Sequence, residues 1–391
     1  MAAFDLVYGF LHLIELIVGF NLIFPLFLFI CWKIKSKKSS HSIPSSDRDY
    51  AIIITAYEQT DLVPDVVNSI LATNYSNYTI YVVADHCSPS DNLVFTDERV
   101  KVLFPEVVLA SNIKSHFYAI TNFIREHEVL LIMDSDNLAD PGLMVGLNIY
   151  FDLGFDAVQG VRAAKNLNST IANLDAARDI YYHFYDGKIL FELGSSATLS
   201  GSGMAFKTDL YRQVLENTAV KGAGFDKVLQ AQILKLNKRI AFSDEALVYD
   251  QKTATSKQLV NQRSRWINTW FRFFKFGFGL VTNGIKNFSL NQFLFGIILL
   301  RPPLFMFLSM AFLLIFLNLF INPVVSVILS IAFLIFILSF LIALSNSKTD
   351  KRIYQALRFI PVFIFYQFVS LVKSMIPNER NVATKHDHQK K

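Results

Sequence analysis

The chain has 391 residues, of which 52% are hydrophobic and 37 are phenylalanine, and its formal net charge is +5. The apolar residues are concentrated at residues 8–32 and again from about residue 290 onward, which indicates membrane segments around a soluble middle part. The two cysteines, Cys31 and Cys87, exclude a disulfide framework and a cysteine metal site, and suit a reducing compartment. Basic residues cluster beside apolar runs, so an anionic membrane surface is a better partner than nucleic acid.

Residues 8–32 are long and apolar enough to cross a bilayer. No basic leader or cleavage site accompanies them, so we expect an uncleaved N-terminal membrane anchor over residues 1–38. His12 and Glu15 lie one helical turn apart inside this segment and should either face other protein or lie near the interface. The positive-inside rule places the basic flank in the cytoplasm and the N-terminus outside. That flank consists of Lys33, Lys35, Lys37 and Lys38, and a serine-rich linker follows at residues 39–48.

The middle of the chain, residues 39–255, repeats a strand–helix–strand order. Apolar runs predict buried strands at 51–56, 79–84 and 129–133, and apolar residues at 3.6-residue spacing predict helices at 63–71 and 113–124. Such an order predicts a doubly wound, mostly parallel α/β sheet with right-handed crossovers.

Acidic residues follow the predicted strands. The central strand ends in Asp134-Ser135-Asp136, the second ends in Asp85, and the first is followed by Glu58. The carboxyl ends of parallel strands meet at one edge of a sheet, where ligands bind. Two carboxylates so close together stay ionised most easily around Mg²⁺ or Mn²⁺ with phosphate oxygens as further ligands, although an Asp-rich turn is the alternative. This pattern predicts a nucleotide pocket with a metal, without a Gly-rich phosphate loop of the Rossmann or Walker type.

Two later segments each have a structural and a functional interpretation. Residues 199–206 predict a small-residue loop that enters a strand, where Gly201 and Gly203 would either permit close approach to a ligand or form an ordinary hairpin. Asp226 falls in the first turn of a predicted helix, where its carboxylate would either cap the helix or act as a catalytic base.

Residues 256–300 are predicted to form amphipathic helices at the membrane surface. Gln262, Arg265 and Trp266 lie on one helix face, and aromatic residues interleaved with Arg and Lys follow them. Aromatic side chains mixed with cations are typical of a helix in the headgroup region. They would also suit nucleic acid, which the neighbouring membrane segments disfavour.

The C-terminal membrane region is expected over residues 301–376. Two spans, 301–321 and 324–344, are joined by a connection so short that they must form an antiparallel hairpin. The last apolar stretch, 353–376, contains charged and polar residues and is predicted to lie in the interface or to be re-entrant. We therefore expect three full spans, with four as the alternative, and a basic cytoplasmic tail at residues 377–391.

Over roughly residues 50–275 the sequence resembles the membrane-integrated family-2 glycosyltransferases, of which cellulose, chitin and hyaluronan synthases are the best-known members. The resemblance rests on an ordered set of motifs, namely Thr55-Ala56-Tyr57-Glu58, Val83-Ala84-Asp85-His86-Cys87-Ser88, Asp134-x-Asp136-Asn137, Gly201-x-Gly203, Asp226 and Gln262-x-x-Arg265-Trp266. It implies a GT-A fold, a nucleoside-diphosphate sugar donor with UDP as the expected nucleotide, and a divalent cation. It also implies a glycan acceptor and a multi-pass protein of the plasma membrane with a cytoplasmic catalytic domain.

The resemblance also implies roles for single residues. On the donor side, Ala56, Tyr57, Glu58 and Asp85 would hold the nucleobase, Lys114 would lie near the nucleotide, Asp134 would contact the ribose or the metal, and Asp136 would coordinate the metal. Arg265 would also belong to the donor side and bind the pyrophosphate. Asp226 would be the general base of an inverting displacement, and on the acceptor side Trp266 would stack against the sugar beside Gln262.

The sequence departs from the family pattern at a few positions. Phe225 replaces an acidic residue, Lys227 replaces an apolar residue, and Glu58-Gln59 replaces the more frequent Asn-Glu. The alternatives to glycan extension are transfer of a single sugar to a lipid, such as a polyprenyl phosphate or a glycolipid, and a non-catalytic membrane scaffold. A long polymer would also call for a homo-oligomer or a separate exporter, because three or four spans are few for a channel.

Overall fold

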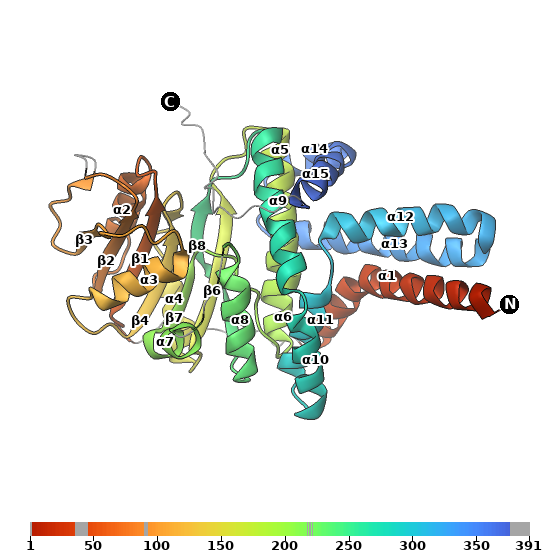
Figure 1. Cartoon of the computed structure of the whole chain (residues 1–391), viewed down its shortest axis with the longest axis horizontal. Helices are drawn as coiled ribbons and strands as arrows, with labels where there is room; N and C mark the ends of the chain where they lie inside the picture. Colours follow the sequence, from red (N-terminus) through yellow and green to blue (C-terminus); the bar gives the residue numbers. More distant parts are fainter. Residues whose placement is uncertain are drawn as a thin grey trace.

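The computed structural model describes residues 2–35, 46–89, 93–216, 218, 220 and 222–375 (Figure 1). Lys37, Lys38, the linker residues 39–45 and the predicted basic tail lie outside the described residues. The sheet domain lies at one end of the molecule and the long apolar helices project from the other (Figure 1).

The described part of the middle domain contains one mixed sheet of eight strands in the order β3-β2-β1-β4-β7-β6-β8-β5. The strands are β1 (Tyr50–Tyr57), β2 (Tyr78–Asp85), β3 (Val100–Leu103), β4 (Val129–Asp134), β5 (Leu138–Ala139), β6 (Ala157–Ala164), β7 (Met204–Lys207) and β8 (Ile240–Asp250). β7 runs antiparallel to β4 and β6, β5 runs antiparallel to β8, and the other pairs are parallel. The predicted mostly parallel α/β sheet is confirmed.

The central strands are apolar throughout because both faces of the sheet are covered. In β1, Ile52 and Ile54 join a core beneath α2 (Val63–Leu71) and α4 (Leu143–Asp152). Ala51 and Ile53 point to the opposite core, with α3 (Asn112–Thr121), α7 (Thr208–Leu215) and α8 (Phe225–Lys235). The helix predicted to reach residue 124 ends at Thr121. Ile124 lies beyond it with a largely exposed side chain, and its backbone N–H donates to the Tyr81 hydroxyl (3.0 Å).

The register of the strands brings their acidic ends together. Tyr57 lies opposite Asp85 in the β1–β2 pair, and Thr55 lies opposite Asp134 in the β1–β4 pair. The three strand ends that the sequence singled out therefore lie on neighbouring strands at one edge of the sheet.

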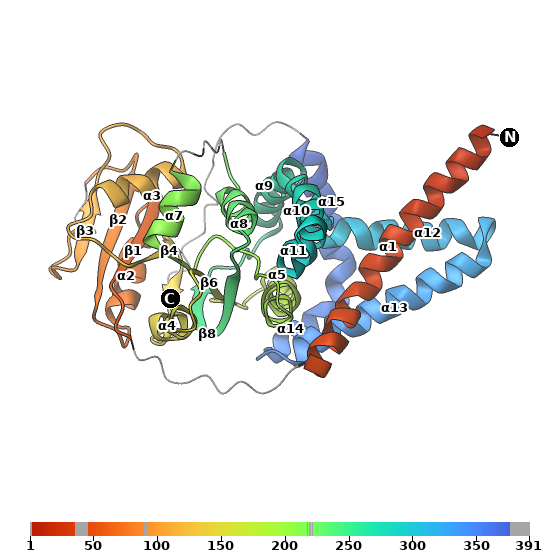
Figure 2. The same cartoon turned by 90° about the horizontal axis from the view of Figure 1, so that it is seen from below.

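A second layer of helices separates the sheet from the apolar helices (Figure 2). One continuous helical segment of α5 (Thr170–Tyr182), the π-helix η2 (His183–Ile189) and α6 (Leu190–Glu192) lies against β8. The segment predicted to be amphipathic forms three helices, α9 (Ser256–Phe273), α10 (Phe276–Lys286) and α11 (Leu290–Leu300). A capping box of Thr255 and Gln258 fixes the start of α9.

In the described residues, four helical segments are long and apolar enough to cross a membrane: Tyr8–Lys35, Leu304–Ile321, Pro323–Ser345 and Lys351–Ser374. The first belongs to α1 (Ala2–Lys35), and the next two are α12 and α13, which form the predicted hairpin. The last consists of α14 (Lys351–Ala356), a 3₁₀ turn and α15 (Ile360–Ser374). α1, α12 and α13 project together from the domain, whereas α14 and α15 run across the base of this bundle (Figure 2).

Glu15 links α1 to α12 inside the apolar bundle. Its side chain is buried and accepts hydrogen bonds from Asn318 (2.7 Å), and it contacts the His12 ring (2.7 Å). The expectation that polar groups of the first span face other protein therefore holds for Glu15, whereas the side chain of His12 is about half exposed.

We expect Asn318→Leu to lower the free energy of unfolding by about 1 kcal/mol, the usual size of an interhelical hydrogen bond in a membrane. Ser330→Ala is the control, because the Ser330 hydroxyl bonds only within its own helix, to Ser326 (2.8 Å). Unfolding of the purified protein in mixed micelles measures both variants, and equal stability losses would show that the Glu15–Asn318 contact contributes nothing specific.

Candidate active site

A cavity of about 830 Å³ opens at the edge of the sheet where the acidic strand ends meet. Nine of the residues predicted to form the site lie on its wall: Ala56, Tyr57, Asp85, Asp134, Asp136, Asp226, Gln262, Arg265 and Trp266. The wall continues to Arg301 and Leu304, at the start of α12. Acids that are distant in the sequence therefore share one cavity with a helix at the membrane side of the domain.

Asp85 supports the wall of the cavity from beneath. It is 2% exposed, and its two carboxylate oxygens accept hydrogen bonds from the backbone N–H groups of Leu109 (2.9 Å) and Ala110 (2.8 Å). Asp85 thereby holds the loop that leads into α3, whose residues Ala110 and Ser111 also line the cavity.

Two residues predicted to bind the donor do not line the cavity. Glu58 lies beyond the end of β1, is about half exposed, and contacts the His86 ring (3.1 Å). Lys114 is exposed in the first turn of α3, where its backbone N–H is capped by the Ser111 hydroxyl. A bound nucleotide would have to extend toward the rim to reach either side chain.

Asp134 and Asp136 form a pair at the end of β4 that fits a divalent cation. Burial, followed by the neighbouring carboxylate of Asp136, raises the pKa of Asp134 to about 7. Among the described residues, no group of three or more His, Cys, Asp or Glu side chains could hold a metal ion. The chemistry of the pair therefore suits a cation that takes further oxygen ligands from a diphosphate, and such a cation would stabilise both ionised carboxylates.

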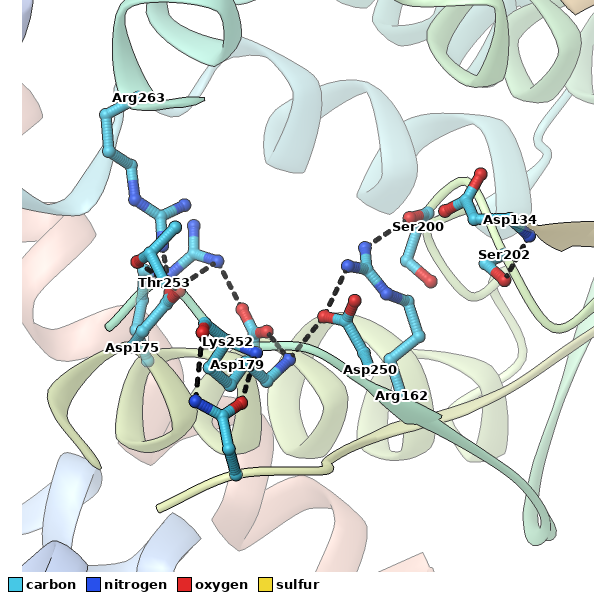
Figure 3. A network of polar contacts seen from close by, with 12 residues as sticks. Asp134, Arg162, Asp175, Asp179, Ser200, Ser202, Asp250, Lys252, Thr253 and Arg263 are labelled. Carbon is cyan, nitrogen blue, oxygen red and sulfur yellow. Dashed lines mark hydrogen bonds and ion pairs between the residues drawn. The ribbon is translucent and has the colours of Figure 1, made fainter. Parts of the chain in front are cut away.

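A buried network of charged side chains begins near Asp134 (Figure 3). Arg162 donates to Asp250 (2.6 Å) and to the Ser200 carbonyl (2.6 Å), and Lys252 binds both Asp250 (2.8 Å) and Asp179 (2.6 Å). Burial alone would raise the pKa of Asp250, but Arg162 and Lys252 hold that pKa below its ordinary value. These charges are therefore mutually neutralised inside the protein.

The network continues to α9 and reaches Trp266. Arg263 pairs with Asp175, which also accepts a hydrogen bond from Thr253 (3.2 Å). The guanidinium groups of Arg178 and Arg263 lie 4.6 Å and 4.1 Å from the centre of the Trp266 ring. The ring predicted to stack against a sugar is thus already held by two cations.

Sequence reasoning did not single out Arg162, Asp179 or Asp250, although all three line the cavity. Asp250 could have been found, because it ends β8 as Asp134 ends β4. Asp179 follows Asp175 by four residues, which places two carboxylates on one helix face, but this spacing is common on exposed helices. The spacing of Asp175 and Asp179 does not show that their helix face is buried, because burial depends on tertiary packing.

Asp226 lies in the first turn of α8, beside the cavity, with its carboxylate 3.2 Å from the Lys227 ammonium. The helix begins at Gly224, whose φ of 98° favours glycine. A Cβ atom at Gly224 would lie 2.5 Å from a methyl carbon of Thr269, so only glycine lets the start of α8 pack this closely on α9. The contact places Asp226 next to the helix that carries Gln262, Arg265 and Trp266.

The segment Thr198–Gly203, called here the 198–203 loop, connects the parts of the site. The Ser202 hydroxyl accepts from the Asp134 N–H (3.1 Å), and the Leu199 carbonyl accepts from Lys227 (3.1 Å). The Thr198 N–H donates to the Asp186 carbonyl (3.0 Å). Four residues span at most about 14 Å, so the acidic pair, the Asp226 region and η2 follow one another along this short loop.

Comparison with protein families agrees with this geometry. The model of the family "Glycosyltransferase like family 2" matches residues 47–269, which is more than half of the chain. The chain belongs to this family, and the protein is a glycosyltransferase.

A solved structure shares the fold. Mannosyltransferase PcManGT from Pyrobaculum calidifontis, solved in complex with GDP-Man and Mn²⁺, matches 94% of this chain and 99% of its own, with 12% identity and a TM-score of 0.54. TarS 1–349 from S. aureus, solved in complex with UDP-GlcNAc, matches 83% of this chain and 89% of its own, with 15% identity and a TM-score of 0.42. Comparison with curated proteins gave no match. The architecture is the expected GT-A fold with apolar helices near both ends of the chain.

Proposed function

We propose that the protein is an inverting, metal-dependent glycosyltransferase that moves a sugar from a nucleoside-diphosphate sugar, with UDP as the expected nucleotide, to a growing glycan at the membrane. The observation that carries the proposal is the single cavity shared by the Asp134–Asp136 pair, Asp226 and Arg265. The structure of PcManGT in complex with GDP-Man and Mn²⁺ supports a nucleotide-sugar donor and a divalent cation.

The cavity residues allow a direct displacement. The oxygen of an acceptor hydroxyl attacks the anomeric carbon, the bond from that carbon to the diphosphate oxygen breaks, and the electron pair leaves with the nucleoside diphosphate. Asp226 accepts the hydroxyl proton, which contributes about 10²–10⁴ to the rate. Arg265 donates hydrogen bonds to the departing diphosphate. A divalent cation held by Asp136 and Asp134 would neutralise the charge that builds up on the leaving group. A single displacement of this kind inverts the anomeric configuration.

We also propose the orientation of the protein in the membrane. α1, α12 and α13 would cross it, and α14–α15 would lie in the interface, because that segment runs across the base of the three-helix bundle (Figure 2). The hydrogen bond from Lys373 to Asn261 of α9 (2.6 Å) supports this placement, because α9 is itself expected at the surface. The lysines at the end of α1 would then hold the catalytic domain on the cytoplasmic side of the plasma membrane.

One observation favours a second acceptor class. The cavity wall includes Arg301, Pro302, Pro303 and Leu304, where α11 passes into the apolar hairpin. A lipid-linked acceptor could enter at this point directly from the membrane, so transfer of one sugar to a lipid is the alternative to glycan extension.

Release of nucleoside diphosphate from a panel of UDP- and GDP-sugars by the full-length protein in lipid vesicles tests the proposal. Excess EDTA should abolish release, and added Mn²⁺ or Mg²⁺ should restore it.

We expect Asp136→Ala to lose the metal-dependent part of donor binding, because one carboxylate cannot hold the cation. A titration with Mn²⁺ that is unchanged in this variant would contradict the assignment of Asp136.

A further inference from the structure

The membrane-side half of the cavity contains polar groups for which the mechanism above has no use. Asp186 of η2 is 3% exposed and Gln230 of α8 is 0% exposed, and both line the cavity. Within the part of the chain that the structure describes, the Asp186 Oδ1, the Gln230 Nε2 and the Ser200 hydroxyl have no hydrogen-bond partner. A buried polar group without a partner is costly, so these atoms are expected to meet a ligand.

The two side chains are held rigidly by their other atoms. The second carboxylate oxygen of Asp186 pairs with Arg301, which lies at the junction of α11 and α12. The Gln230 Oε1 accepts a hydrogen bond from the Leu199 N–H (3.0 Å). Each side chain therefore uses one oxygen for the protein and leaves one atom without a partner: an acceptor at Asp186 and a donor at Gln230.

Both groups lie close to the proposed base. Gln230 follows Asp226 by four residues on α8, so the two side chains are neighbours on one helix face. The 198–203 loop connects α8 to Asp186. Leu199 of this loop bonds to Gln230 and to Lys227, both on α8. The preceding residue, Thr198, donates to the backbone carbonyl of Asp186.

We propose that Asp186 and Gln230 form an acceptor subsite for the hydroxyl groups of a neutral sugar ring, one helical turn from Asp226. A sugar hydroxyl both donates and accepts, so adjacent hydroxyls satisfy a carboxylate oxygen and an amide N–H₂ together. A phosphate or a uronic acid does not fit, because its negative charge would face the open oxygen of Asp186. The cations that act on Asp186 offer little compensation, since Arg301 is paired with Asp186 itself and Lys227 with Asp226.

This inference rests on the proposed function and makes it more specific. The group that attacks the donor belongs to a sugar and is not the phosphate of a polyprenyl phosphate. An acceptor sugar that is itself linked to a lipid remains compatible with the subsite.

Two variants test the subsite in full-length protein in lipid vesicles, with the nucleotide sugar that the panel identifies and with neutral disaccharides (cellobiose, chitobiose, mannobiose) as acceptor probes. Asp186→Asn keeps the size of the side chain but presents an N–H₂ donor in place of the acceptor oxygen. Gln230→Met keeps the length of the side chain and removes both its donor and the oxygen that accepts from the Leu199 N–H, a loss that the control below reproduces. Each should raise the KM of the disaccharide by about tenfold or more, a larger effect than on the rate of donor hydrolysis by water.

Gln159→Met is the matched control. Gln159 is equally buried and accepts a hydrogen bond from the next residue of the same loop, Ser200 (2.9 Å). Its amide nitrogen is already bonded to the carbonyls of Gly160 (2.9 Å) and Ser202 (3.1 Å), and it does not line the cavity. This variant should lose stability much as Gln230→Met does, without a change in the acceptor KM.

The inference is overturned if both cavity variants keep the wild-type KM, or if Gln159→Met raises it as much. Transfer to a C55 polyprenyl phosphate that exceeds transfer to every disaccharide would also overturn it. If the wild-type protein turns over no nucleotide sugar at all, the proposed function itself is contradicted. Failure of the subsite and failure of the proposed function are therefore distinguishable.

Discussion

Asp226→Asn should reduce the rate of glycosyl transfer by about 10²–10⁴, because the amide cannot accept the proton of the acceptor hydroxyl. Donor binding should remain near normal, since Asn keeps the size of the side chain and the Asp134–Asp136 pair is intact. Measurement of transfer rate and of donor affinity in the same preparation separates the two effects.

Asp209→Asn is the control for this substitution. Asp209 occupies the first turn of α7, as Asp226 does in α8, but it is exposed and does not line the cavity. Its loss should leave both the rate and the donor affinity unchanged. If donor affinity falls in step with activity in Asp226→Asn, Asp226 is a binding residue and the assigned role is wrong.

Lys252→Met should lower the free energy of unfolding by about 3–5 kcal/mol, because it removes the cation shared by two buried carboxylates. Lys252 is 2% exposed, and burial opposes its charge, but Asp179 and Asp250 raise the pKa of its ammonium above the ordinary value. Without it, Asp179 and Asp250 retain only Arg178 and Arg162. Chemical unfolding of the purified protein, followed by the fluorescence of its tryptophans, measures the loss.

Lys238→Met provides the comparison. The ammonium of Lys238 also pairs with a carboxylate, that of Asp156, but its side chain is 42% exposed. Surface pairs contribute about 0–1 kcal/mol, so this variant should be nearly neutral. Equal losses in the two lysine variants would show that the network acts as a set of independent surface pairs.

The parts of the fold that could be predicted are those with a strong local signal. β1, β2 and β4 are unbroken apolar runs, and α2 shows clear 3.6-residue spacing, so their positions agree with expectation to within a residue or two. The strand that residues 199–206 were predicted to enter is β7, but its four residues are too few to show its antiparallel direction. The two-residue strand β5 is too short to show a period. The π-helix η2 could not be foreseen, because its conformation depends on packing between α5 and the sheet.

The site was predictable where chemistry follows directly from the end of a strand or from a family motif. Asp134 and Asp136 at the end of β4 are the clearest case, and both line the cavity. Glu58 and Lys114 were assigned from the family resemblance, and a matching position does not show whether the side chain lines the cavity. Gln230 and Asp186 carry no motif, and only the three-dimensional structure shows their unpaired atoms.

The charged network that joins the acidic pair to α9 also limits which substitutions the protein tolerates during evolution. Asp250 pairs with both Arg162 and Lys252, and Lys252 also pairs with Asp179. Loss of any one member leaves the buried charges of its neighbours incompletely balanced. Substitutions along this chain should therefore be inherited in compensating pairs, and homologous sequences should vary together at these positions even though none of them performs the chemistry.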